Sequence, residues 1–83
     1  MTSNAPKPRP LIVIVDSDPV FSSELARRLE DLGCLVLGQA ASGREGMELI
    51  GRVRPDIALI SLALKGGMDG IRTARAIREK CGV

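Results

Sequence analysis

Three short apolar runs alternate with amphipathic stretches along the chain. Leu11–Val15 is apolar throughout, Ile57–Leu64 is apolar except for Ser61, and Leu35–Gln39 is a short run that begins with three apolar residues, so each predicts a β-strand. Strands that are apolar on both faces are typical of parallel sheets covered by helices. The pattern therefore predicts an α/β fold.

Apolar residues at helical spacing follow the first strand. The predicted helix runs from Pro19 to Leu32, with Asp18 as N-cap, Pro19 at the first helical position and Gly33 as the left-handed stop. Its inward face is expected to hold Phe21, Leu25, Leu29 and Leu32.

A second helix is predicted after Ser42, because Ser42 and Glu45 have the spacing of a capping box. Pro55 prevents its extension, since a proline ring is incompatible with a helix interior. Its inward face is expected to hold Met47, Ile50 and Val53.

A third helix is predicted near the end of the sequence, with Asp69 as its cap and Gly82 as its end. Its inward face is expected to hold Ile71, Ala74 and Ile77. Its solvent face is expected to hold Arg72, Arg75 and Arg78.

The element order is β-α-β-α-β-α. Short right-handed crossovers then give three parallel strands in the order 2-1-3, with helices on both faces of the sheet. Asp16 and Ser61 follow the first and third strands, so we expect them side by side at the carboxyl edge of the sheet, where ligands bind in such folds.

Composition limits the chain to one small domain. Its 83 residues are 45% hydrophobic and 27% charged, as in an ordinary globular protein. Residues 1–10 contain three prolines and predict a flexible leader before a folded part at residues 11–83. A chain this short buries only roughly 60 to 65% of its unfolded surface, so help from a partner is expected.

Charge and cysteine content exclude several classes of protein. The net charge of +2 is too small to argue for nucleic-acid binding, which only the arginine face and the basic leader favour. No apolar run reaches the roughly 18 residues of a membrane span, and no signal peptide is recognisable, so we expect a cytoplasmic protein. Cys34 and Cys81 lack metal-ligand spacing and are expected to be reduced.

The chain resembles the front part of a response-regulator receiver domain of two-component signalling, which has a flavodoxin-like fold. The resemblance covers residues 11–83 and rests on three segments, LIVIVDSDPVF, AASGREGMELI and PDIALISLALKGGMDGIRTARAIREK. It implies that a kinase phosphohistidine donates a phosphoryl group to an aspartate at the end of the third strand. It also implies that acidic residues after the first strand hold Mg²⁺.

Two substitutions depart from that pattern. Ser61 occupies the phospho-acceptor position, and its hydroxyl lacks the nucleophilicity of a carboxylate unless a base activates it. Ser17 replaces the second acidic residue, which leaves Asp16 and Asp18 as the only candidate metal ligands. Asp18 also serves as the helix cap. We therefore expect no enzymatic activity, no bound Mg²⁺ and no other cofactor.

The third departure is length. A receiver has five strands and five helices, and this sequence is expected to be truncated after the third helix, without the family's hydroxyl residue, phosphate-binding lysine and output surface. Its third strand would then be an open edge. We expect a homodimer, or completion by another polypeptide, through the residues Ile57, Leu59, Ile60, Leu62 and Leu64.

The favoured hypothesis is a phosphorylation-independent pseudo-receiver that acts as a protein-interaction module in two-component signal transduction. One alternative is a residual receiver in which Asp18 and Ser61 still respond to Mg²⁺ and phosphate. The other is a fragment of a longer response regulator.

Overall fold

The computed structural model describes residues 9–61, Leu64 and residues 70–82. Six elements follow one another as β1 (Leu11–Val15), α1 (Pro19–Asp31), β2 (Leu35–Ala40), α2 (Gly43–Val53), β3 (Ile57–Ile60) and α3 (Gly70–Cys81). The strands form one parallel sheet in the order β2-β1-β3. The predicted element order and sheet topology are both confirmed.

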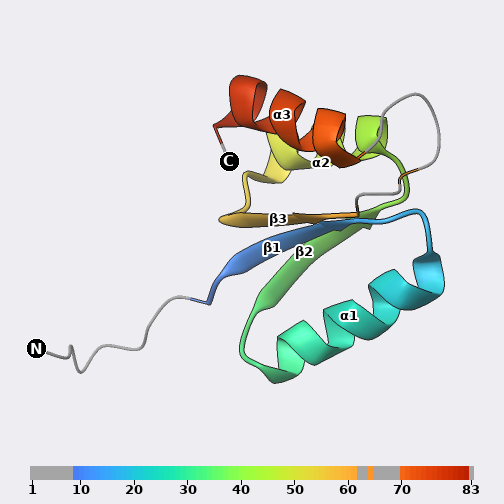
Figure 1. The fold of residues 1–83 in the computed structure, drawn as a ribbon. Coiled ribbons are helices and arrows are strands. Elements are labelled where there is room, and N and C mark those ends of the chain that lie inside the picture. Colours follow the sequence, from blue (N-terminus) through green and yellow to red (C-terminus); the bar gives the residue numbers. More distant parts are fainter. Residues whose placement is uncertain (1–8, 62–63, 65–69, 83) are drawn as a thin grey trace, which may run out of the picture.

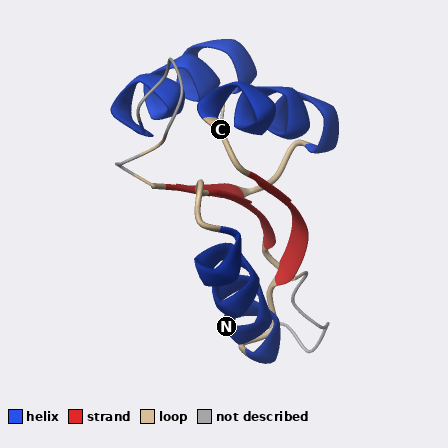
Figure 2. Cartoon of the chain, turned by 90° about the vertical axis from the view of Figure 1, so that its right-hand side faces the viewer, coloured by secondary structure: helices blue, strands red, loops and turns tan. Residues whose placement is uncertain are grey.

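The helices cover the two faces of the sheet unequally. Of the helices in the described residues, α1 lies on one face, whereas α2 and α3 lie together on the other (Figure 1). Figure 2, turned by 90°, shows the same three layers. On the α1 side the buried apolar residues are Ile12, Ile14 and Ala26. On the α2 and α3 side they are Val13, Val15, Ala40, Ile50, Leu64 and Ile77.

β1 is the central strand, and its two ladders differ in regularity. It pairs with β3 in continuous register from Ile12 opposite Ile57 to Val15 opposite Ile60. Its register with β2 shifts between Ile12, which lies opposite Val36, and Val13, which lies opposite Gly38, so Leu37 falls between two paired positions. β1 thereby buries alternate side chains on both faces of the sheet, as its apolar sequence predicts.

The predicted caps of the first two helices are formed. The Asp18 carboxylate accepts hydrogen bonds at the start of α1, and Gly33 has the left-handed φ of +96° after its end. Ser42 Oγ accepts from the Glu45 N–H at 3.2 Å, while Glu45 Oε1 accepts from the Ala41 N–H at 3.1 Å. The glutamate therefore reaches one residue beyond the cap itself.

The predicted inward face of α1 is partly wrong. Leu25 and Leu29 pack toward the sheet, but Phe21 is 52% exposed and Leu32 is 80% exposed. The buried positions are Ser22 and Ala26, whose small side chains allow the helix backbone to approach β1. The contact stripe therefore follows the small residues rather than the largest apolar ones.

The predicted inward face of α3 is also partly wrong. Ile77 is buried, but Ile71 is 61% exposed and Ala74 is exposed as well, whereas Thr73 is fully buried. α3 contacts α2 more extensively than β3, so its buried stripe turns toward α2. The exposure expected for the arginine face is confirmed at Arg72, Arg75 and Arg78.

The third strand is shorter and less buried than predicted. It ends at Ile60 instead of Leu64, and Ile57 is 43% exposed, so it is not buried on both faces. Leu64 lies in the core on the α3 side, whereas Leu62 lies outside the described residues. β2 extends one residue beyond its predicted end, to Ala40.

Some expectations fall outside the described part of the chain, namely the cap at Asp69, the side chain of Cys81 and the leader at residues 1–8. The carbonyl oxygen of Pro10, at the end of the predicted leader, accepts from the Leu35 N–H at 2.8 Å. Backbone pairing next to β2 therefore begins before Leu11. Cys34 is a free thiol, as expected.

Candidate functional site

Asp16 and Ser61 meet at the carboxyl edge of the sheet, as the sequence predicts. The Asp16 N–H donates to the Ala40 carbonyl oxygen at 3.0 Å, and the Ser61 N–H donates to the Val15 carbonyl oxygen at 2.9 Å. Both residues line one cavity of about 230 Å³. The ends of three neighbouring strands therefore fix the backbone on which these side chains stand.

The carboxylates after β1 are engaged by backbone groups. Asp16 Oδ1 accepts from the Asp18 N–H at 2.8 Å, which closes a tight turn over Ser17. Asp18 Oδ1 accepts from the Val20 and Phe21 N–H groups at 3.0 and 3.2 Å, as an N-cap does. Each carboxylate thus uses one oxygen to shape the loop and the start of α1.

Few charged side chains line the cavity. Asp16 is the carboxylate that lines it, together with the hydroxyl-bearing Ser61. Asp18 is exposed and lies at the head of α1, and Ser17 is half-buried in the turn between the two aspartates. Within residues 9–61, 64 and 70–82, no group of three or more histidine, cysteine, aspartate or glutamate residues is placed to hold a metal ion.

The walls of this cavity are mainly apolar. Phe21 and Leu25 come from α1, and Leu59 and Ile60 come from β3. Phe21, the single aromatic residue of the chain, is half-exposed here because α1 is the one described helix on this face. Sequence reasoning placed Phe21 in the core and missed this apolar opening. Its position in the first turn of the helix, beside the acidic loop, was the available signal.

A second cavity lies on the opposite face of β3. It measures about 270 Å³ and is lined by Asp56, Ile57, Ala58, Ile60, Ala74 and Ile77. The outer flank of β3 is therefore hollowed on both faces, toward α1 on one side and toward α3 on the other. Of the predicted contact residues, Leu59 lines the first cavity, Ile57 lines the second and Ile60 lines both.

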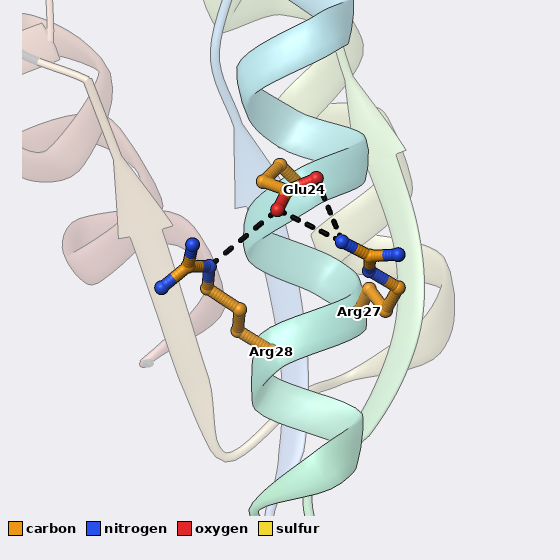
Figure 3. A network of polar contacts seen from close by, with 3 residues as sticks. All are labelled: Glu24, Arg27 and Arg28. Atoms are coloured by element: carbon orange, nitrogen blue, oxygen red, sulfur yellow. Dashed lines mark hydrogen bonds and ion pairs between the residues drawn. The ribbon is translucent and has the colours of Figure 1, made fainter.

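A larger hollow, of about 550 Å³, lies on α1 and is separate from the Asp16 cavity. Glu24 lines it and pairs with Arg27 at 2.9 Å and with Arg28 at 3.6 Å (Figure 3). These side chains are 47 to 74% exposed, so water screens the pairs. This hollow is a solvated helix surface and not a candidate active site.

Among the helices of the described residues, none is both long and apolar enough to cross a bilayer.

Comparison with known proteins identifies curated relatives. The chain is 35% identical over 69 residues to a protein-glutamate methylesterase/protein-glutamine glutaminase of Hahella chejuensis, covering 83% of this chain and 20% of that protein. It is 37% identical over 76 residues to the probable transcriptional regulatory protein NarL of Mycobacterium tuberculosis, covering 89% of this chain and 35% of that protein. The chain thus spans about a third or less of either relative.

Solved structures show the same similarity. The signal receiver domain of a modulated diguanylate cyclase from Desulfovibrio desulfuricans superimposes with a TM-score of 0.84 at 35% identity, over 89% of this chain and 59% of that one. A two-component response regulator of the LuxR family from an Aurantimonas species gives 0.83 at 32% identity, over 90% of this chain and 54% of that one. Both are receiver-containing proteins of the flavodoxin-like fold.

The family assignment agrees with the geometry. Asp16 after β1 and Ser61 after β3 share one cavity at the carboxyl edge of a 2-1-3 parallel sheet. Residues 12–82 match the response regulator receiver domain family, a family of signalling modules. The chain belongs to the response regulator receiver domain family.

Proposed function

We propose that this chain is a phosphorylation-independent receiver that acts as a protein-interaction module in two-component signal transduction. The observation that carries the proposal is Ser61, a hydroxyl residue at the end of β3 where the family pattern has its phospho-accepting aspartate. Membership of the receiver family supports the signalling context. The change of residue argues against phosphoryl transfer as the working step.

The chemistry of Ser61 supports this proposal. A serine hydroxyl needs an adjacent general base to become a good nucleophile, and the chain contains no histidine. Asp16 shares the cavity, but its Oδ1 already accepts the Asp18 N–H. An acyl phosphate also cannot form on a serine, so any product would be a stable phosphate ester rather than a labile switch.

The proposal also excludes a working Mg²⁺ site. Mg²⁺ prefers octahedral oxygen ligands that include one or two carboxylates and several waters. Ser17 removes one carboxylate of the family pattern and Ser61 removes another, while Asp18 caps α1. Of the three carboxylates in the family pattern, Asp16 is the one that remains in the lining of the cavity, so we expect no tight Mg²⁺ site here.

Acetyl phosphate tests the absence of phosphoryl chemistry. The purified chain is incubated with acetyl phosphate and Mg²⁺ and its intact mass is recorded, with an active receiver domain as the positive control. The mass is expected to stay unchanged. A phosphoryl adduct that disappears in the Ser61→Ala variant would instead support the residual phosphate-responsive receiver.

The association surface of this proposal is the β3 edge, defined as the side of Ile57–Ile60 that faces away from β1. Its four residues include no charge and no proline, the usual protections of an open strand edge. Cavities flank it on both faces, Ile57 of the edge itself is exposed, and the exposed Phe21 lines one of the two cavities. Such an edge favours strand addition by a protein partner.

A second proposal is that the chain is one part of a longer response regulator. The relatives support it, since the matching region makes up 20 to 35% of their length. Intact mass of the endogenous protein tests this. A mass equal to that of the 83-residue chain contradicts it.

A further inference from the structure

The three helices differ in their balance of charge. α1 has two basic residues against three acidic ones, a net charge of −1, and α2 has two against two, a net charge of zero. α3 has four basic residues against one acidic residue, a net charge of +3. Positive charge is therefore concentrated on α3, although the chain as a whole carries only +2.

The arginine face of α3, made of Arg72, Arg75 and Arg78, lies opposite the buried stripe of this helix. Thr73 and Ile77 are buried, and successive helical residues are about 100° apart, so Arg75 stands about 200° from both. Arg72 and Arg78 lie about 60° to either side of Arg75, and all three are exposed. With α2, α3 forms the outer layer on its side of the sheet (Figure 1). The centre of the arginine face therefore points away from the sheet and does not border the β3 edge.

Helix stability does not account for these charges. Arg78 and Lys80 lie in the last turn of α3, where basic residues favour the helix dipole, but Arg72 lies in the first turn, which has no acidic residue. Arg75 has an arginine three residues away on each side, and like charges at this spacing repel one another. Within residues 9–61, 64 and 70–82, no acidic side chain forms an ion pair with Arg75 or Arg78. The arginine face thus lowers the stability of the helix and suits a ligand that supplies negative charge.

The spacing of the arginines fits an acidic helix. They are three residues apart, so they rise by about 4.5 Å at each step along α3. Acidic residues three or four apart on another α-helix rise by about 4.5 or 6.0 Å, whereas those on one face of a strand are about 6.6 Å apart. Glu79, four residues after Arg75, disfavours a nucleic acid, whose phosphates are all negative. Phe21, the single aromatic residue of the chain, lies on the α1 side, so no aromatic side chain is present here for base stacking.

We infer that the arginine face of α3 binds an acidic helix of a partner protein, which lies alongside α3 with its carboxylates against Arg72, Arg75 and Arg78. Arginine suits this role, because its guanidinium group binds a carboxylate through two parallel hydrogen bonds. This surface goes beyond the proposed function, since it depends on the charges of α3 and on neither Ser61 nor strand pairing at β3. Added salt is expected to weaken the complex by screening the attraction.

Binding of a model peptide tests the arginine face. The probe is a fluorescent helical peptide whose glutamates recur every three and four residues, and its anisotropy is recorded as the chain is added at low salt. Replacing Arg75 and Arg78 together by glutamine is expected to weaken binding roughly fivefold or more, as the loss of two ion pairs predicts. The matched control replaces Arg27 and Arg28 of α1 by glutamine, which removes the same charge, and should weaken binding by less than roughly twofold. Equal losses in the two variants overturn the inference, and so does an unmodified chain that does not bind.

Two measurements on the unmodified chain test the class of partner and do not depend on the folding of a variant. Amide chemical shifts recorded with the same peptide are expected to change along α3 and to stay constant along α1. Changes centred on α1 or on the β3 edge overturn the inference. A peptide of equal composition whose glutamates are spread around the helix should bind more weakly, and so should a DNA duplex. Equal binding of the spread peptide, or tighter binding of the duplex, overturns an acidic helix as the partner.

The α3 surface and the proposed function can fail independently. Phosphorylation of a chain whose arginine face still binds the acidic peptide overturns only the proposed function. An unphosphorylated chain that does not bind the peptide overturns only the role of the arginine face.

Discussion

Asp56 and Leu11 hold each other by two reciprocal hydrogen bonds, both 2.8 Å long. The Leu11 N–H donates to Asp56 Oδ2, and the Asp56 N–H donates to the Leu11 carbonyl oxygen. This pair of hydrogen bonds joins the first residue of β1 to the residue that precedes β3. Asp56→Ala is expected to lower the free energy of unfolding by about 1 kcal/mol, because one bond is lost and Leu11 N–H must turn to water.

The matched control for this hydrogen-bond pair is Asp56→Asn, which keeps a side-chain oxygen for the Leu11 N–H. In urea unfolding, Asp56→Asn should lower the free energy of unfolding less than Asp56→Ala does. Equal losses for both variants would show that charge, and not the hydrogen bond, stabilises this end of the sheet.

Gly46 is a close-packing position between α2 and β1. A Cβ added there would stand 2.7 Å from Val15 Cγ2 and 3.0 Å from Cγ1. Val15 is fully buried and β-branched, so it cannot turn aside easily. We expect Gly46→Ala to destabilise the fold by about 1 to 3 kcal/mol, the usual effect of overpacking, despite the better helix propensity of alanine.

Gly51 provides the control on the same helix, because it is exposed. Gly51→Ala should stabilise the chain by up to about 1 kcal/mol through helix propensity alone. Thermal unfolding of both variants checks the contrast. Adding Val15→Ala to Gly46→Ala should recover part of the loss if the clash causes it.

Asp18 can be tested separately as a cap and as a metal ligand. Asp18→Ala should destabilise the chain by about 1 kcal/mol, because the Val20 and Phe21 N–H groups lose their acceptor. Asp18→Asn should stay close to the unmodified chain, since asparagine caps equally well. The Tm of the unmodified chain and of both variants should not depend on Mg²⁺. A rise of Tm with Mg²⁺ that Asp18→Asn abolishes would assign Asp18 to a metal site.

The Glu24 network on α1 should contribute little. Its three side chains are largely exposed, and exposed pairs stabilise helices by roughly 0.2 to 1 kcal/mol. Glu24→Gln is expected to lower the free energy of unfolding, measured in urea, by an amount within that range. The difference from the unmodified chain should vanish at high salt. A salt-independent loss would point to a role for Glu24 beyond ion pairing.

Local signals predicted the backbone of this fold well. Asp18, Gly33 and the Ser42 capping box mark real helix ends, because the interactions that form them lie within a few residues of one another. The 2-1-3 order followed from short right-handed crossovers. The neighbouring positions of Asp16 and Ser61 then followed from that order alone.

The inward faces of α1 and α3 could not be predicted in the same way. Phe21 and Ile71 have helical spacing typical of a core, yet both are exposed, whereas Ser22 and Thr73 are buried. Which stripe of a helix is buried depends on how closely it approaches the sheet and on which helix lies beside it. Those are tertiary relationships, and hydrophobic periodicity does not contain them.

The central position of β1 also has a consequence for synthesis on the ribosome. β1 is made first, but β3, which pairs with it, is separated from it by α1, β2 and α2. The most apolar strand must therefore wait for its second neighbour while more than forty later residues are made, as the register of Val15 with Ile60 implies. During that interval we expect the edge of β1 that later pairs with β3 to be open to chaperones and to aggregation.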